Sequence, residues 1–168
     1  SDQLPSALPA RMRAKLWTES MDAIGSSFEM GIVTSRKFHG EVSVLQLGRI
    51  QLGSAKTVAD GAVTVLRSEA KLRQDNDDRI MILINRGETP MSVRQFDRRV
   101  DLKRGEMTVL AMDMPSECAT PQSGHSHVIL LPREILQQPG RMLELFSATR
   151  LKTHRTAQLL LSHNVEQL

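Results

Sequence analysis

The histidines His125 and His127 have a spacing that metal chemistry could use. Residues i and i+2 of a β-strand face the same side, so the two imidazoles would point in one direction. A zinc or iron site needs at least three protein ligands, and the next acidic residue, Glu134, lies beyond Pro132. No histidine-bearing strand is predicted after the one that carries His125 and His127. We therefore expect neither a metal ion nor another cofactor.

Other patterns of catalytic residues are missing from the sequence. It contains no Gly-x-Ser-x-Gly turn, phosphate-binding glycine loop or dinucleotide fingerprint. Cys118 stands beside Glu117, whose charge would raise the pKa of the thiol and disfavour the reactive thiolate. Asp75, Asp77 and Asp78 lack the glycine and the later glutamate of a calcium loop, so we expect a solvated loop there. We therefore expect no catalytic residue and no enzyme activity.

The elements that would position these residues are organised around the stretch 79–112. The ranges 80–84, 91–96 and 107–112 are short and apolar, and a glycine and a proline interrupt the chain at 85–90. Strands joined by turns, with no helical period between them, predict an antiparallel meander. Several hairpins in one domain are typical of a β-barrel or jelly roll.

The remaining elements follow from the same reasoning. Helical spacing of apolar residues predicts a helix over 11–24, which packs on the barrel through Trp17. The other expected elements are a short edge segment at 28–36, strands at 41–47, 49–52, 62–67 and 125–131, and loops at 72–78 and 116–124. The predicted fold class is therefore mainly β, an antiparallel β-barrel or jelly roll with flanking helices.

The C-terminal stretch from Met142 onwards has a helical pattern. Apolar residues recur there at three- and four-residue steps, which places them on one stripe: Ala157, Leu160, Leu161, Val165 and Leu168. Such a stripe is wider than a peripheral helix needs, so it predicts a contact with a partner surface. Packing of the stripe on its own barrel is the alternative.

Composition narrows the class of protein further. The chain has 168 residues, 40% of them hydrophobic, and a formal net charge of +3. Basic and acidic residues are interleaved, which favours a mixed solvated surface over a nucleic-acid face, so this chain is not expected to bind DNA specifically. No apolar run is long enough to span a membrane, no signal peptide is present, and Cys118 has no partner cysteine. We expect a soluble cytoplasmic protein with no membrane contact.

Three motifs in sequential order resemble those of a known family. They are the glycine-containing pattern at 38–50, the Leu-x-x-Gly-Glu turn within 100–106 and the strand closed by Leu-Pro-Arg within 127–136. Each motif alone is weak, but their order resembles a cupin-type barrel. Over Leu16 to Leu136 the chain is similar to the N-terminal sensor domain of AraC/XylS-type transcription regulators.

The resemblance implies an organisation and a function. We expect a flexible arm at 1–10, a cupin-like sensor domain at 11–136 and a helical dimerisation segment at 137–168. Members of the family carry a helix-turn-helix DNA-binding domain after the barrel, and we expect it to be absent from this chain. A small-molecule effector inside the barrel would bias that domain in a homodimer. A metal-dependent cupin enzyme, an oxygenase or isomerase, is the alternative, and a barrel that only dimerises is a third.

The resemblance and the strand periodicity also predict an effector pocket. Inward positions recur at every second residue of a strand, and the last strand of arabinose-type relatives contributes to their effector pocket. The expected lining residues are Met81, Leu83, Met91, Val93, His125 and His127. A partly exposed histidine pair at a strand end is the alternative interpretation of His125 and His127.

Overall fold

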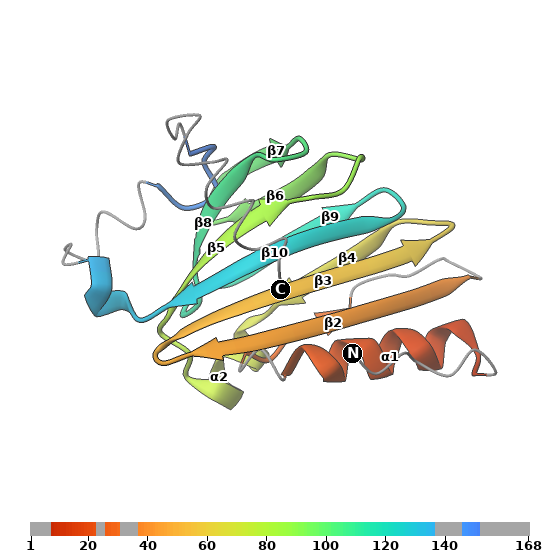
Figure 1. Ribbon diagram of the computed structural model, residues 1–168, viewed down its shortest axis with the longest axis horizontal. Helices are drawn as coiled ribbons and strands as arrows, with labels where there is room; N and C mark the ends of the chain where they lie inside the picture. Colours follow the sequence, from red (N-terminus) through yellow and green to blue (C-terminus); the bar gives the residue numbers. More distant parts are fainter. Residues whose placement is uncertain (1–7, 23–25, 31–36, 137–145, 152–168) are drawn as a thin grey trace.

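The computed structural model describes residues 8–22, 26–30, 37–136 and 146–151. Its elements in chain order are α1 (Ala10–Met21), β1 (Glu29–Met30), β2 (Phe38–Leu47), β3 (Ile50–Ala59), β4 (Val63–Arg67), α2 (Glu69–Asp75), β5 (Ile80–Asn85), β6 (Met91–Gln95), β7 (Arg98–Leu102), β8 (Met107–Ala111), β9 (Ser116–Thr120), β10 (Gly124–Leu131) and the 3₁₀ helix η2 (Arg133–Leu136). The strands form two five-stranded antiparallel sheets that face each other (Figure 1). The mainly β prediction, with a jelly-roll arrangement and an N-terminal helix, is confirmed.

The two sheets divide the strands in an order that differs from the predicted meander. One sheet has the order β1-β4-β9-β6-β7 and the other has the order β2-β3-β10-β5-β8. The meander prediction is wrong because β5 and β6, which follow each other in the chain, belong to different sheets. The connection through Gly87 and Pro90 carries the chain across the sandwich, so β5 pairs with β8 and β10 instead.

The core lies between the sheets and is closed at one edge by α1. This helix lies along β2 (Figure 1), and its Trp17 ring meets the Phe38 ring edge-on with centroids 5.8 Å apart. Gly40 of β2 allows this approach, because a Cβ at that position would overlap the Trp17 indole. The indole N–H also donates to the Glu41 carbonyl at 3.3 Å. Trp17 therefore anchors α1 on the barrel, as its place in the apolar stripe predicts.

Two of the predicted loops are in part regular structure. Of the predicted loop 72–78, residues 72–75 are the end of α2, which ends at Asp75 with Asn76 as its left-handed C-cap at φ 48°, and 76–78 are a loop as predicted. The expected loop at 116–124 begins with β9, which pairs with both β4 and β6. Both predictions were wrong in part, at 72–75 and 116–120. These segments are polar in sequence, and for β9 pairing with two neighbouring strands overrides a weak local preference.

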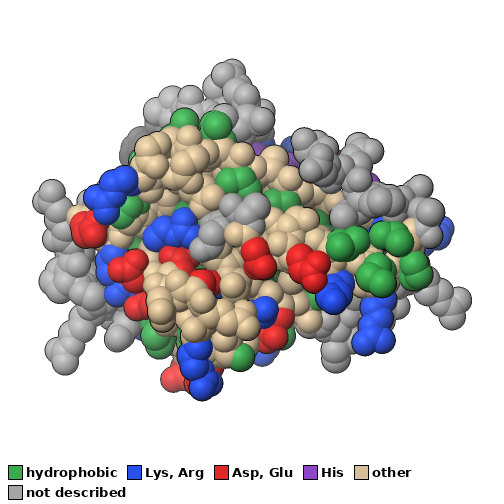
Figure 2. Space-filling model, turned by 90° about the horizontal axis from the view of Figure 1, so that it is seen from below, with side chains coloured by type: hydrophobic (Ala, Val, Ile, Leu, Met, Phe, Trp, Pro, Cys, Tyr) green, Lys and Arg blue, Asp and Glu red, His purple; other side chains and the backbone are tan. Residues whose placement is uncertain are grey.

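The surface of the described residues carries mixed charge. Figure 2 shows the face that carries α1, where Lys and Arg side chains lie among Asp and Glu side chains. Exposed ion pairs such as Arg49–Glu134 and Arg99–Asp101 add to this pattern. In the described part of the chain, no helix has the length and apolar character needed to cross a bilayer.

Candidate functional site

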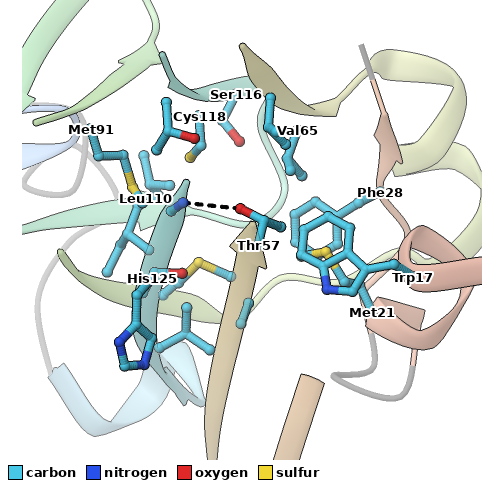
Figure 3. Close-up of a pocket in the computed structure, with 18 of the residues that line it drawn as sticks. Trp17, Met21, Phe28, Thr57, Val65, Met91, Leu110, Ser116, Cys118 and His125 are labelled. Atoms are coloured by element: carbon cyan, nitrogen blue, oxygen red, sulfur yellow. Dashed lines mark hydrogen bonds between the residues drawn. The ribbon is translucent and has the colours of Figure 1, made fainter. Parts of the chain in front are cut away.

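A cavity of about 80 Å³ lies between the two sheets and against α1. Helix α1, the residue before β1, and strands from both sheets supply its walls (Figure 3). The lining residues are Trp17, Met21, Phe28, Ala55, Thr57, Val63, Val65, Met81, Leu83, Met91, Leu110, Met112, Ser116, Cys118, Thr120, Gly124, His125, Ser126 and Val128. The cavity therefore lies where the barrel core is incompletely filled, beside the N-terminal helix.

The predicted pocket residues on the central strands occupy two kinds of position. Met81 and Leu83 on β5 and Met91 on β6 line the cavity. Val93, two residues after Met91, is fully buried in the core cluster and is not among the lining residues. The inward periodicity thus brings these four residues to the same core, and only three of them reach the open volume.

The predicted pocket histidines, His125 and His127, point to the other face of their sheet. Across β10 and β3, His125 lies opposite Lys56 and His127 lies opposite Ser54. Residues directly opposite each other share a face, and the intervening Ser126 faces the cavity. Although His125 is a lining residue, Figure 3 shows its ring directed away from the side chains gathered around the cavity.

On that outer face the histidines contact each other and neighbouring strands. Their rings meet edge-on with centroids 5.0 Å apart, and His125 Nε2 lies 3.3 Å from Ser54 Oγ. Burial lowers the pKa of His125, and the charge of Lys56 lowers it further. Burial, followed by the influence of His125 and Arg86, lowers the pKa of His127 to about 4. Both imidazoles are therefore neutral near pH 7.

The chemistry of the cavity wall is apolar and rich in sulfur. Met21, Met81, Met91 and Met112 surround the space together with Cys118. Burial and then the neighbouring charge of Glu117 raise the pKa of Cys118 to about 12, so its thiol stays protonated. The neighbouring Glu117 led us to predict this unreactive thiol from the sequence. The expected loop at 116–124 did not indicate that Cys118 faces a cavity.

A few hydroxyl groups are the polar atoms of the wall. Thr57 on β3 is 5% exposed, and its Oγ1 accepts a hydrogen bond from the Gly124 N–H at 3.1 Å (Figure 3). Ser126 on β10 is 9% exposed, and among the described residues its side-chain Oγ makes no hydrogen bond. Sequence reasoning missed both residues. Ser126 lies between the two histidines, so the correct assignment of that strand's faces would have identified it.

A buried ion pair supports one end of the cavity. The Arg67 guanidinium, whose side chain is fully buried, holds Asp75 through two hydrogen bonds of 2.7 and 2.8 Å. Arg67 also donates to the Met112 carbonyl at 2.6 Å and to the Ser27 carbonyl at 2.9 Å. Since Met112 lines the cavity and Ser27 precedes the lining residue Phe28, this arginine fixes two parts of the wall.

Two further predictions concern metals and the dimer contact. Within the described ranges, no three His, Cys, Asp or Glu side chains are grouped as metal ligands would be. The predicted interface residues, Ala157, Leu160, Leu161, Val165 and Leu168, lie outside the described residues.

Comparisons with known proteins agree with this architecture. Among solved structures, the chain is similar to the AraC-like transcriptional activator CuxR, with a TM-score of 0.71 and 16% identity over 99% of this chain and 59% of that one. A cupin superfamily protein from Desulfitobacterium hafniense matches with a TM-score of 0.44 and 10% identity, over 61% of this chain and 84% of that one. No curated protein sequence matches the chain significantly.

The likeness to CuxR, at 16% identity, concerns the fold. The chain spans 59% of the CuxR chain, so it corresponds to part of that protein. The sequence itself matches a family model, the AraC-binding-like domain, over residues 26–168. Because this match covers most of the sequence and includes every strand from β1 to β10, the chain belongs to the AraC-binding-like domain family.

Proposed function

We propose that this chain is the effector-sensing and dimerisation domain of an AraC-type transcription regulator. The observation that carries the proposal is the cavity between the sheets, which an independent element, α1, helps to enclose. A small molecule in that space would touch both sheets and the helix at once. Its binding would therefore stabilise the contact between α1 and the barrel. A change of this kind, which depends on the ligand, is what a sensor domain passes on to the rest of a regulator.

Family membership and the likeness to CuxR support this proposal. A DNA-binding part would belong to a longer regulator, since the chain spans only part of CuxR. In that arrangement the described residues would sense the effector, the segment 137–168 would join two copies, and DNA would be bound elsewhere. Such a regulator would act in the cytoplasm.

We also infer that the domain acts without catalysis. Among the described lining residues, no carboxylate or imidazole ring points into the cavity, and the Cys118 thiol is protonated at neutral pH. General acid–base and nucleophilic chemistry both need such groups within reach of a substrate. No feature of the described residues favours the cupin-enzyme alternative.

Filling the cavity tests the proposal. In the regulator that carries this chain, Ala55→Leu adds volume to a lining position, and Ala119→Leu adds the same volume on the outer face of the opposite sheet. We expect Ala55→Leu to abolish effector-dependent transcription from the target promoter while DNA occupancy in cells persists. We expect Ala119→Leu to retain the response. A full response from a folded Ala55→Leu variant would contradict the proposal.

A further inference from the structure

We propose that the effector is a neutral, largely apolar small molecule with one hydrogen-bonding group, which the hydroxyls of Thr57 and Ser126 bind. This inference rests on the proposed function, because it assigns a chemical class to the ligand of the same cavity. Three features of the wall carry it: its lack of charge, the buried hydroxyls of Thr57 and Ser126, and its thioether side chains.

The described lining residues provide no charge to pair with an ionic ligand. They include no Lys, Arg, Asp or Glu, and the His125 ring lies on the far face of its strand. The Cys118 thiol is protonated, so it adds no negative charge. A carboxylate or ammonium ligand would lose its hydration without gaining an opposite charge, and this loss disfavours binding strongly.

The two hydroxyls supply the hydrogen-bonding capacity. Thr57 Oγ1 accepts from the Gly124 N–H, but no acceptor for its own proton occurs among the described residues. Ser126 is nine-tenths buried, and its Oγ makes no hydrogen bond to another side chain or backbone group in the same part of the chain. Buried hydroxyls normally find partners, so these two mark where a ligand atom is expected.

The positions of the hydroxyls fit a single polar group. Thr57 lies opposite Gly124 and Ser126 lies opposite Ala55, which makes Thr57 and Ser126 diagonal neighbours on one face. Such neighbours are roughly 7 Å apart, so one amide or carbonyl group placed between them could reach both hydroxyls. Thr57 would donate to a ligand oxygen, and Ser126 would donate to it or accept from a ligand N–H.

The methionines of the wall favour a ligand whose apolar part is a planar ring. An apolar cavity of about 150 Å³ accommodates benzene, whereas this one measures about 80 Å³. Unbranched Met side chains change rotamer easily and make favourable contacts with aromatic rings. Movement of Met21, Met81, Met91 or Met112 would enlarge the space for one planar ring.

The single tryptophan of the chain makes occupancy measurable. Trp17 lines the cavity, so its fluorescence reports a ligand bound there. The probes are benzamide, benzoate and toluene, which share a ring but differ in charge and hydrogen bonding. In titrations at pH 7, we expect saturable binding of benzamide and toluene, and at least tenfold weaker binding of benzoate.

Substitutions of the hydroxyls test their role. Thr57→Val keeps the shape of the side chain, and we expect it to weaken benzamide binding about tenfold while toluene binding is unchanged. Ser126→Ala should also weaken benzamide binding and leave toluene binding unchanged. Thr57→Ser, which keeps the hydroxyl for both the ligand and the Gly124 N–H, should bind benzamide as wild type does. Unchanged toluene binding by Thr57→Val distinguishes a lost ligand contact from a disturbed strand. Thr64→Val, on the outward side of β4, is the matched control and should behave as wild type.

The outcomes separate this inference from the proposed function. If benzoate binds as tightly as benzamide and Ala55→Leu blocks both, the ligand class is wrong and the cavity remains a ligand site. If Thr57→Val and Ser126→Ala leave benzamide binding unchanged, the assigned hydroxyls are wrong. If none of the three probes binds the folded chain, this inference is overturned, and the promoter assay with Ala55→Leu then decides the proposed function separately.

Discussion

His127 is a buried side chain with an unmet hydrogen bond. It is 5% exposed, and its Nδ1 atom has no hydrogen-bond partner among the residues that the structure describes. An unsatisfied buried polar atom costs about 1–3 kcal/mol. His127→Leu removes that atom and puts an apolar side chain in its place. We therefore expect it to raise the free energy of unfolding at pH 7 by about 1 kcal/mol. Urea unfolding followed by circular dichroism measures this change, and a large loss of stability would show that the imidazole makes a needed contact.

The same residue predicts a dependence of stability on pH. The pKa of His127 is about 4 in the folded protein, against 6.5 for an ordinary histidine. Between these values the unfolded state binds more protons, so stability is full above pH 6.5 and falls as the pH drops towards 4. One such group contributes a slope of at most about 1.4 kcal/mol per pH unit. The free energy of unfolding, measured by urea unfolding at several pH values, should depend less on pH between 4 and 6.5 for His127→Leu than for wild type.

Strands buried on both faces explain why the histidines were assigned to the wrong side. On β5, five of the six residues are buried, so no alternation of apolar and polar residues identifies the inward face. The outer face carries an aliphatic row across the whole sheet, formed by Leu45, Leu52, Ile129, Ile82 and Val109. The inward periodicity of Met81, Leu83 and Met91 was predictable from the sequence. The face of His125 and His127 depends on register with β3, which the sequence alone does not encode locally.

At the scale of elements, Arg67 joins parts of the chain that are distant in sequence. It links the end of β4 to α2 through Asp75, to the segment before β1 through Ser27 and to the end of β8 through Met112. Hydrogen bonds from Arg67 hold the pKa of Asp75 well below its usual range, against the opposing effect of burial. No pattern in the sequence indicates this pair, because Arg67 and Asp75 become partners only when α2 folds back on β4.

Breaking the pair from one side should destabilise the fold strongly. Arg67→Met leaves the Asp75 carboxylate without its partner, and such a change costs about 3–5 kcal/mol. Adding Asp75→Asn removes the unpaired charge and keeps an acceptor for the Ser27 N–H, so the double variant should recover part of the loss. Chemical unfolding of the single and double variants measures both values. Equal stabilities of Arg67→Met and wild type would contradict this account.

Acid should weaken the same contact. Because the folded-state pKa of Asp75 is depressed, its contribution is fully present above about pH 4 and is lost as the pH falls further. The pH range therefore differs from that of His127, and the two effects can be measured separately in variants at each position.

The close packing of α1 on β2, through Trp17 and Gly40, can also be tested by substitution. In Gly40→Ala the new methyl group would overlap the Trp17 indole, so the ring and the helix must move. Overpacking of this kind costs about 1–3 kcal/mol. We expect lower stability and a red shift of Trp17 emission. In a Trp17→Leu background the added cost of Gly40→Ala should largely disappear in unfolding followed by circular dichroism, and a cost that persists would place the strain elsewhere.

The order of elements was easier to predict than their pairing. Most strands appear in the sequence as short apolar runs between turn residues, so their existence and the mainly β class could be derived. The sequence SECAT of β9 has no such signal, and its strand character comes from β4 and β6 on either side. Likewise, no local pattern specifies that consecutive strands β5 and β6 enter different sheets.

At the scale of the whole molecule, the proposed regulator requires two copies of the domain. The described residues form one barrel, and the stripe expected to join the copies lies in 152–168, outside them. The sequence-based argument is the recurrence of Ala157, Leu160, Leu161, Val165 and Leu168 on one face of a helix. In a two-fold interface each substituted residue occurs on both sides, so its effect is doubled.

Charges introduced on the stripe should therefore separate the copies. We expect Leu161→Glu with Val165→Glu to give a monomer in sedimentation equilibrium, with the circular dichroism of the barrel retained. Ser162→Glu with His163→Glu introduces two acidic residues on the opposite helical face and should remain dimeric. If the stripe variant stays dimeric, the copies meet through another surface. If it unfolds while the control does not, the stripe packs on its own barrel, because burying each leucine contributes roughly 1.5–3 kcal/mol to whichever surface covers it.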